Sequence, residues 1–217
     1  EIKDYYSQLL GLSGDDSYKE RCKLHTVCGH DGGILHSGDG RISIVTYQGD
    51  FNYSAVNDLG ASYASGEYIL LLNNDTEVIT ANWMEEMLMY AQREDVGAVG
   101  AKLYYADKTI QHAGVVIGLG AHRTAGHTHY RIPVQNLGYM GRLCYPQNVT
   151  AVTGACLLVK KSLYEQVGGL DESFVISLND VDFCLKLRKL GLLNVWTPFA
   201  ELYHYESISR GLDDQGE

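Results

Sequence analysis

Three polar clusters in the sequence combine residue types that could do chemistry. The first is Asn73-Asn74-Asp75-Thr76, which directly follows an apolar run. It places one carboxylate and two amides where a divalent cation and a nucleotide diphosphate could meet, because Mg²⁺ takes carboxylate and phosphate oxygens as ligands. The same residue types also form Asx turns at strand ends, and this tetrapeptide alone leaves both interpretations open.

The second cluster is Asn179-Asp180-Val181-Asp182, at the predicted start of a helix. One of its carboxylates could accept a proton from an attacking hydroxyl at the mouth of a cleft. Acidic residues are also expected at this place because they complement the helix dipole and cap free N–H groups, so a structural role is the alternative. Two Asp residues two positions apart on a helix point in different directions, and Asp180 and Asp182 therefore need separate roles.

The third cluster contains His204, whose imidazole could bind a metal ion or a phosphate, although a structural histidine is the more common case. A further candidate lies near the N-terminus, where Cys22, His25, Cys28 and His30 could bind Zn²⁺ in an inserted loop. Their spacing matches no standard zinc finger, so a disordered insertion rich in Cys and His is the alternative.

The elements that must position these clusters are those of an α/β fold. Residues 68–72 form a continuous apolar run typical of a strand covered on both faces, and the first cluster lies at its carboxyl end, where open α/β sheets bind ligands. The stretch 11–40 lacks apolar periodicity and looks the least structured, and the loop 120–148 has the length of a binding lid. We expect helices over residues 2–10, 54–65, 80–93, 161–167 and 179–190, and strands over residues 42–47, 68–72, 96–103, 114–119, 151–159, 195–196 and 202–203.

The composition is that of a globular protein. The chain has 217 residues, 45% of them hydrophobic, and a formal net charge of −10, which favours one domain with its own core and gives no general field to attract nucleic acid. The five scattered cysteines fit free thiols in a reducing, cytosolic setting, with Cys156 and Cys184 inside apolar runs. No apolar run approaches the roughly 20 residues that span a bilayer, and the N-terminus does not have the pattern of a signal peptide.

Five ordered segments resemble family 2 glycosyltransferases, and their joint occurrence favours the functional interpretation of the three clusters. The segments are 68–76, 151–156, 167–171, 179–184 and 201–207, with the sequences YILLLNNDT, AVTGAC, VGGLD, NDVDFC and ELYHYES. The similarity covers about residues 41–211. It is closest to the rhamnosyltransferase-like members that build bacterial surface polysaccharides, which also carry a segment like residues 51–57.

The resemblance implies a GT-A fold, an α/β domain with a mixed, mostly parallel, Rossmann-like sheet flanked by helices. It also implies an inverting transfer of a sugar from a nucleotide-diphosphate donor to a glycan or lipid-linked glycan, with Mn²⁺ or Mg²⁺ as cofactor. By this analogy Asp180 is the general base, with Asp182 as second choice, and Asp75 and His204 are metal ligands. The resemblance also implies a set of donor-binding residues, some of which form a wall beside the sugar while a cationic one lies near the leaving diphosphate. These residues are Asn57, Asn73, Asn74, Asp75, Thr153, Gly154, Ala155 and Arg210.

The similarity does not extend to the first strands of family members, which carry the acidic residue that grips the nucleotide base. Residues 1–40 match poorly and contain the insertion, and residues 2–10 resemble the helix after the second strand. We therefore expect an N-terminally truncated, single GT-A-like domain. A sheet that lacks two strands exposes apolar edges, which favours pairing with another chain, including a homo-oligomer.

The sequence predicts a cytoplasmic glycosyltransferase that moves a hexose, or a deoxyhexose such as rhamnose, during synthesis of bacterial cell-surface polysaccharide. Its lipid-linked substrates imply peripheral association with the inner face of the plasma membrane. The alternative is a non-catalytic remnant that binds a nucleotide, or a glycan through Tyr130, Tyr139 and Tyr145. A nucleotidyltransferase is disfavoured because the sequence has no basic, Gly-rich phosphate loop.

Overall fold

The computed structural model describes residues 25–29, 32–36, 43–119 and 123–205, and the chain divides into two compact units, Glu1–Phe51 and Asn52–Glu217. The first unit contains a three-stranded antiparallel sheet in the order β1 (His25–Gly29), β2 (Gly32–His36) and β3 (Ser43–Val45). The expectation that residues 11–40 lack regular structure is wrong for β1 and β2. Their sequences, HTVCG and GGILH, gave no sign of a strand because five residues are too few to show an apolar period. The helix expected over residues 2–10, and Cys22 and His30 of the zinc hypothesis, lie outside the described residues, so both stay predictions.

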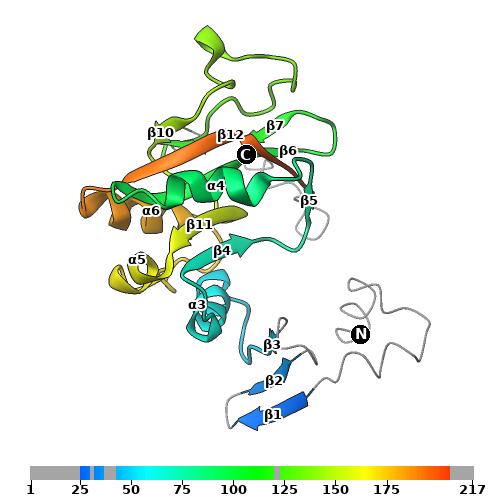
Figure 1. Cartoon of the computed structure of the whole chain (residues 1–217), viewed down its shortest axis with the longest axis vertical. Coiled ribbons are helices and arrows are strands. Elements are labelled where there is room, and N and C mark those ends of the chain that lie inside the picture. Colours follow the sequence, from blue (N-terminus) through cyan, green and yellow to red (C-terminus); the bar gives the residue numbers. More distant parts are fainter. Residues whose placement is uncertain (1–24, 30–31, 37–42, 120–122, 206–217) are drawn as a thin grey trace, which may run out of the picture. The chain divides into compact units, whose positions relative to one another are not determined.

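The second unit is built on a mixed, seven-stranded sheet in the order β10-β12-β6-β11-β4, with β5 paired to β12 and β7 paired to β6. β12 and β6 run parallel, whereas β11 runs antiparallel to both of its neighbours, β6 and β4. β4, β6 and β12 therefore run in the same direction, and their carboxyl ends point to one edge of the sheet (Figure 1). The strand bounds are β4 (Tyr68–Leu72), β5 (Thr76–Val78), β6 (Val96–Tyr104), β7 (Ile110–His112), β10 (Gln147–Val149), β11 (Cys156–Lys160) and β12 (Leu193–His204).

The expected class, a mixed α/β sheet with flanking helices, is confirmed, but the sheet is less parallel than we expected. Among the described strand pairs of this sheet, β6–β12 is parallel and the others are antiparallel. The cause is β11, which enters between β4 and β6 in the opposite direction. A continuous apolar sequence indicates that a strand is covered on both faces, but it does not tell which way the strand runs. β4 ends the described sheet, and pairing of this edge with another chain stays a prediction.

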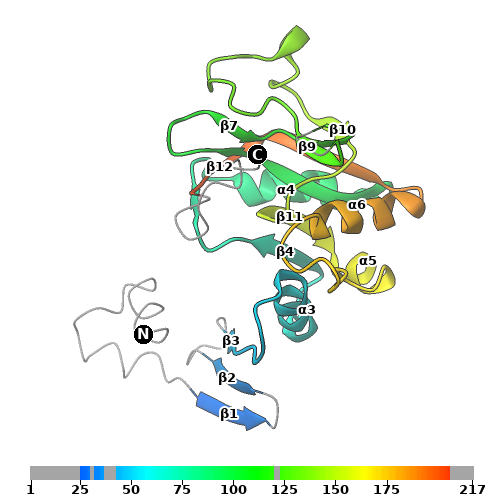
Figure 2. The same cartoon turned by 180° about the vertical axis from the view of Figure 1, so that it is seen from behind.

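Helices cover both faces of this sheet (Figures 1 and 2). On one face lies α4 (Trp83–Ala91), whose Trp83, Met87 and Ala91 belong to one buried apolar cluster with residues of β6, β11 and β12. On the other face lie α3 (Tyr53–Tyr63), α5 (Lys161–Gln166) and α6 (Asn179–Lys189). The two apolar clusters explain why β4 is apolar along its whole length and β6 is apolar except for Lys102.

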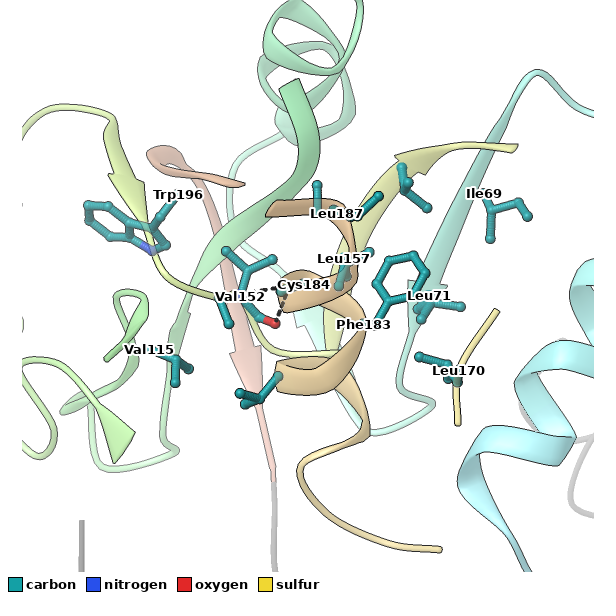
Figure 3. Close-up of a cluster of buried hydrophobic side chains, with 14 of the residues drawn as sticks. Ile69, Leu71, Val115, Val152, Leu157, Leu170, Phe183, Cys184, Leu187 and Trp196 are labelled. Atoms are coloured by element: carbon teal, nitrogen blue, oxygen red, sulfur yellow. Dashed lines mark hydrogen bonds between the residues drawn. The ribbon is translucent and has the colours of Figure 1, made fainter. Parts of the chain in front are cut away.

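The apolar cluster on the face covered by α3, α5 and α6 holds α6 against the sheet, close to the carboxyl edge of the sheet. Figure 3 shows Phe183, Cys184 and Leu187 of α6 beside Val152 and Leu157. Burial raises the pKa of the Cys184 thiol to about 12, so the thiol stays protonated and can donate to the carbonyl of Val152 at 3.7 Å. α6 is therefore tied to the chain segment that leads into Thr153-Gly154-Ala155.

Most predicted elements are present with shifted ends. The strand expected over 151–159 begins only at Cys156, because residues 153–155 turn before it, and the pieces expected at 195–196 and 202–203 are parts of β12. α4 begins after Asn82 instead of Thr80. The loop 120–148 contains β9 (Ala125–His127), which pairs with β8 (Val115–Ile117), the short helix η1 (Tyr139–Gly141) and part of β10.

The described residues bear on two expectations, one about membrane-spanning helices and one about free cysteines. None of the helices in the described ranges combines the length and hydrophobicity needed to cross a bilayer. Cys144, Cys156 and Cys184 are free in the described part of the chain. Cys156 and Cys184 are buried, as we expected from their apolar surroundings.

Gly100, in the centre of β6, gives a test of this packing. A Cβ atom at Gly100 would lie 2.5 Å from the Cβ of Val152, and we expect Gly100→Ala to lower the free energy of unfolding by about 1–3 kcal/mol through overpacking. Gly60→Ala on α3 is the matched control, because its Cβ meets nothing within 4 Å and alanine favours a helix by roughly 0.5–1 kcal/mol. Urea denaturation of both variants checks this, and equal stability of the Gly100 variant and wild type would contradict it.

Candidate active site

A cavity of about 230 Å³ opens at the carboxyl edge of the sheet in the second unit. Its walls are formed by the residue after β4, the last residue of β12, the turn before β11, the start of α6, the strands β8 and β9, and α3. The cavity-lining residues are Tyr53, Asn73, Val115, Ala125, Gly126, His127, Thr153, Gly154, Ala155, Ile176, Ser177, Leu178, Asn179, Asp180, Val181 and His204. It thus combines members of all three polar clusters found in the sequence, at the edge where α/β sheets bind ligands.

The first and third clusters meet at the end of β12. After β4 the chain crosses to this strand and pairs with it as β5, which sets Thr76 opposite His204. Nε2 of His204 lies 3.1 Å from Nδ2 of Asn73 and 3.1 Å from Oδ1 of Asp75. Asn73 and His204 line the cavity, and Asp75, which does not line it, has its carboxylate in contact with His204.

Gln111 of β7 orients the imidazole of His204. Its Oε1 lies 2.7 Å from Nδ1 of His204, and both side chains are buried. An amide oxygen can only accept, so Nδ1 carries a proton and the neutral ring has its lone pair on Nε2, facing Asn73 and Asp75. Histidines that bind metals are usually oriented by such a hydrogen bond from their other nitrogen.

The residues around His204 fit a divalent metal ion. Oδ1 of Asp75 is buried and has no hydrogen-bond partner, and a buried carboxylate oxygen of this kind is costly unless something satisfies it. Two ligands that each lie about 2.1 Å from one octahedral ion are about 3 Å apart, which matches the 3.1 Å between Oδ1 of Asp75 and Nε2 of His204. Within the described residues no group of three His, Cys, Asp or Glu side chains is placed to hold a metal, so other ligands would have to complete its shell.

Asp180 brings the second cluster to the cavity. Its Oδ2 accepts a hydrogen bond from the backbone N–H of Gly154 at 2.9 Å, and its Oδ1 accepts from the N–H of Val181 at 2.8 Å. These bonds fix the carboxylate at the cavity wall. Asp182, one half-turn further along α6, does not line the cavity and instead lies 3.0 Å from Nζ of Lys186. The structure thus separates the two aspartates, as their spacing on a helix predicts.

The start of α6 is held by the first residues of α3. Nδ2 of Asn52 donates to the carbonyl of Glu172 at 2.8 Å, the N–H of Tyr53 donates to Val175 at 2.9 Å, and the hydroxyl of Ser54 donates to Phe174 at 3.0 Å. Leu178, just before the helix, has a φ of 67°, a left-handed conformation that is strained for leucine and lies at the cavity. Residues 52–54 therefore contribute by positioning the loop that leads to Asp180.

Other predicted donor-binding residues lie in different places. Thr153, Gly154 and Ala155 form part of the cavity wall. Asn57 does not line the cavity, and its Nδ2 donates to the carbonyl of Tyr53 in its own helix at 2.7 Å. Asn74 is exposed and also outside the cavity lining, and Arg210 lies outside the described residues.

Gly154 links two sides of the cavity. Its N–H donates to Asp180 and its carbonyl accepts from the hydroxyl of Tyr53 at 3.0 Å. A Cβ at this position would lie 2.9 Å from that hydroxyl oxygen, so Gly154→Ala must displace either Tyr53 or the turn that holds Asp180. We expect a roughly tenfold or greater loss of the activity that depends on Asp180, because small displacements of catalytic groups are costly. Initial rates measured beside Gly60→Ala check this, and a rate equal to wild type would show that the turn adapts.

A pair of histidines that the sequence analysis did not single out forms another wall. His112, at the end of β7, is completely buried, and its Nδ1 lies 2.9 Å from Nδ1 of the cavity-lining His127. The two rings are nearly perpendicular, with centroids 5.0 Å apart. The polar loop 120–148 did point to binding residues, but nothing in the sequence pairs His127 with a buried histidine 15 positions earlier.

The tyrosines that the sequence analysis assigned to glycan binding do not line this cavity. Tyr139 and Tyr145 line a separate, open depression together with Met140 and Arg142. Tyr130 packs edge-on against Tyr105, with ring centroids 5.9 Å apart. Their role in glycan binding stays a prediction.

Burial of His112 makes stability depend on pH. Burial, followed by the charges of His127 and His204, holds the pKa of His112 well below 6.5. The unfolded chain therefore binds a proton below about pH 6.5 that the folded chain excludes, and stability should fall as the pH decreases, by up to about 1.4 kcal/mol per pH unit. In His112→Gln this contribution should be absent. Urea denaturation of both proteins between about pH 7.5 and 5 measures the difference, and parallel curves would show that His112 does not contribute.

The fold around this cavity is that of the GT-A glycosyltransferases. The crystal structure of GalNAc-T7 with UDP, GalNAc and Mn²⁺ is similar with a TM-score of 0.55 at 13% identity, over 71% of this chain and 30% of that one. The mannosyltransferase PcManGT from Pyrobaculum calidifontis, in complex with GDP-Man and Mn²⁺, has a TM-score of 0.50 at 12% identity, over 73% of this chain and 37% of that one. At these identities the likeness shows the fold, and the GT-A prediction is confirmed.

The chain belongs to glycosyltransferase family 2. The model of Glycosyl transferase family 2 matches residues 34–168, which confirms the family inferred from the five sequence segments. The uncharacterized protein y4gI of Sinorhizobium fredii is 50% identical over 186 residues, 85% of this chain and 20% of that protein. O-antigen biosynthesis protein RfbC of Myxococcus xanthus is 41% identical over 176 residues, 81% of this chain and 14% of that protein.

A third relative is similar over a shorter stretch. The N-acetylglucosaminyl-diphospho-decaprenol L-rhamnosyltransferase of Mycobacterium tuberculosis is 44% identical over 62 residues, 29% of this chain and 20% of that protein. This chain therefore spans one fifth or less of the length of these three relatives.

Proposed function

We propose that this cavity is the active site of a glycosyltransferase that moves a sugar from a nucleotide-diphosphate donor to a glycan during polysaccharide synthesis. The observation that carries the proposal is that two different chemical groups face one cavity. The carboxylate of Asp180 stands at the start of α6, and the Asn73–Asp75–His204 group stands at the ends of β4 and β12. A transferase needs both, because one group must accept a proton while the other neutralises a leaving diphosphate.

In the proposed reaction, Asp180 takes the proton of the acceptor hydroxyl as its oxygen attacks the anomeric carbon of the donor. The bond from that carbon to the diphosphate breaks on the opposite face, which inverts the configuration. Asn73 and His204 would orient the diphosphate, and Asp75 and His204 would hold Mg²⁺ or Mn²⁺. When bound, the ion supplies positive charge to the departing diphosphate.

The names of the relatives support the class of product and acceptor. One relative is an O-antigen biosynthesis protein, and another transfers L-rhamnose to a diphospho-decaprenol-linked N-acetylglucosamine. We accordingly propose a hexose or deoxyhexose donor and a lipid-linked glycan acceptor, which would place the reaction at the inner face of the plasma membrane. The nucleotide-bound, Mn²⁺-bound structural neighbours support a metal-dependent donor site.

A turnover assay tests the proposal. The protein is incubated with dTDP-rhamnose, GDP-mannose or UDP-N-acetylgalactosamine, with Mn²⁺ and N-acetylglucosaminyl-diphospho-decaprenol, and the release of nucleotide diphosphate is measured. We expect one donor to give release that depends on both acceptor and metal. Metal-dependent nucleotide binding without turnover would instead support the non-catalytic alternative.

A further inference from the structure

The loop over residues 135–146 carries the three most exposed large hydrophobic side chains of the described residues. Tyr139 and Met140 are each 78% exposed, and Leu137 is 62% exposed. Figures 1 and 2 show this loop standing clear of the seven-stranded sheet, on the side of β10. Clustered apolar side chains that stay in water mark a site where another surface binds. We call the exposed hydrophobic side chains of this loop the tip cluster: Leu137, Tyr139, Met140 and Tyr145.

The loop that carries the tip cluster is held by hydrogen bonds and by a buried side chain. At its base the N–H of Val134 donates to the carbonyl of Lys108 at 3.1 Å, and at its other end β10 pairs with β12. Within the loop the N–H of Leu143 donates to the carbonyl of Leu137 at 2.9 Å, and the side chain of Leu143 is buried in the core. Met140 has a φ of 52°, a conformation that is costly for this residue and is typical of functional positions. The exposed side chains are therefore presented by a formed loop.

The surroundings of the tip cluster are basic although the chain is acidic. All 27 Asp and Glu residues lie outside residues 108–159, and this stretch contains four Lys and Arg residues. The acidic residue just before the stretch, Asp107, pairs with Arg131 at 3.3 Å. Arg142 is exposed and lines one open depression with the two tyrosines of the tip cluster, and its Nε donates to Oε1 of Gln147 at 2.8 Å. A guanidinium held in this way suits a phosphate group.

The size, composition and charge of the loop favour a lipid surface as its partner. The loop is much shorter than the roughly 20–30 residues that each side contributes to a standard protein interface. A tyrosine ring with its polar tip suits the headgroup region of a bilayer, and the aliphatic side chains of Leu137 and Met140 suit the boundary with the acyl chains. A glycan would use the aromatic rings but not these aliphatic side chains. The local positive charge matches a leaflet with anionic lipids, which a chain of net charge −10 would otherwise repel.

We propose that the tip cluster attaches this protein to a bilayer that contains anionic lipids. Tyr139 and Met140 enter the headgroup region, and Arg142 binds lipid phosphate groups. The attachment is reversible, because four side chains on one loop bury little apolar area. The inference goes beyond the proposed function and does not require it, although a lipid-linked acceptor would be found at such a surface.

Vesicle flotation tests the attachment. The protein is mixed with vesicles of phosphatidylcholine alone, or of phosphatidylcholine with about 30% phosphatidylglycerol, and the bound fraction is measured against lipid concentration. We expect stronger binding to the anionic vesicles. Tyr139→Ser combined with Met140→Ser should weaken it at least tenfold, because apolar side chains no longer insert, and Arg142→Gln should weaken it about fivefold. Failure of the wild type to bind anionic vesicles, or preference for phosphatidylcholine alone, would overturn the proposal.

Two control variants change the same chemistry elsewhere on the surface. Met84→Ser combined with Met89→Ser removes two side chains of α4 that are 50% and 53% exposed. Lys189→Gln removes one exposed positive charge at the end of α6. Both should bind anionic vesicles within about twofold of wild type. Losses equal to those of the loop variants would mean that general hydrophobicity or net charge, and not the tip cluster, is responsible.

Fluorescence of Met140→Trp measures insertion directly. The two native tryptophans, Trp83 and Trp196, are 9% and 0% exposed, so an indole at the tip gives a separate signal. We expect anionic vesicles to shift its emission to the blue and brominated acyl chains to quench it. Met89→Trp on α4 should show neither effect. Absence of quenching at position 140, or equal quenching at both positions, would overturn insertion of the loop.

Other occupants of the tip cluster would give different results. A dimer in sedimentation velocity that the Tyr139→Ser, Met140→Ser variant loses would identify a second copy of this chain as the partner and overturn the proposal. Binding of a water-soluble glycan that depends on Tyr139, in a protein that does not bind vesicles, would overturn it in favour of a glycan site. Failure of the proposed function is separate, because vesicle binding uses neither donor nor metal: a protein that binds anionic vesicles through the loop but binds no nucleotide diphosphate would contradict the transferase alone.

Discussion

Asp180→Asn is expected to reduce transfer by about a hundred- to ten-thousandfold, the range that removal of a general base produces. Asparagine has nearly the same shape, and its oxygen can still accept the hydrogen bond from the N–H of Gly154, which is 2.9 Å long in the wild type. Its Nδ2 then faces the N–H of Val181, which in the wild type donates to Oδ1 at 2.8 Å, so we expect a small loss of stability. The variant should still fold and bind nucleotide while it lacks the carboxylate that takes the proton. Initial rates of transfer together with nucleotide affinity measure this.

Asp182→Asn is the matched control for Asp180→Asn. Asp182 is also on the first turn of α6, but its carboxylate pairs with Lys186 and does not line the cavity. We expect its replacement to leave the rate within about threefold of wild type, since this carboxylate does not face the cavity and its partly exposed pair with Lys186 serves only the helix. A large loss in the Asp182 variant with a small loss in the Asp180 variant would reverse the assignment of the base.

Asp75→Ala is expected to weaken Mn²⁺ binding in the presence of a nucleotide diphosphate by about a hundredfold. The substitution removes the only carboxylate that the described residues place against His204, and a charged ligand is a large part of the affinity of a hard cation. Electron paramagnetic resonance of free Mn²⁺ measures the loss. The reciprocal effect on the nucleotide should follow, because the diphosphate and the ion share one site.

Asp95→Asn is the matched control for the metal prediction. Asp95 precedes β6, at the amino end of the strand and thus at the opposite edge from the cavity, and its carboxylate pairs with exposed Arg93 at 2.7 Å. Its removal takes away the same charge without touching the site. Equal weakening of Mn²⁺ binding in both variants would mean that net charge, and not coordination by Asp75, is responsible.

Much of the fold was predictable because its elements have strong local signals. Residues 68–72 are apolar throughout, and residues 96–103 are apolar except for Lys102; they form β4 and most of β6, with the helix α4 between them. The direction of β11 was not predictable, because β11 lies far from β4 and β6 in the chain and only the tertiary arrangement inserts it, antiparallel, between these two strands. Strands of three residues, such as β5 and β7, form by pairing with longer strands and are too short to show alternation of apolar and polar residues in the sequence.

The site was predictable where its residues lie within short motifs. Asn73, Asp75, Asp180 and His204 were singled out from three separate segments, and the structure places Asn73, Asp180 and His204 at one cavity and Asp75 in contact with His204. Gln111, His112 and His127 were missed because their roles depend on hydrogen bonds to residues 15 to 93 positions away. Asn57 was taken for a donor-binding residue because its segment resembles the family, but its neighbours Asn52, Tyr53 and Ser54 hold the loop before α6 while Asn57 bonds its own helix.

The measurement that most directly tests the cavity as a donor site is calorimetric titration of the protein with UDP, dTDP and GDP, each with and without Mn²⁺, repeated on Asp75→Ala. The proposed arrangement of Asn73, Asp75 and His204 predicts that one nucleotide binds in a Mn²⁺-dependent way and that the substitution abolishes this dependence. Binding of none of the three nucleotides to the folded, monodisperse protein, or Mn²⁺-dependent binding that survives Asp75→Ala, would contradict it.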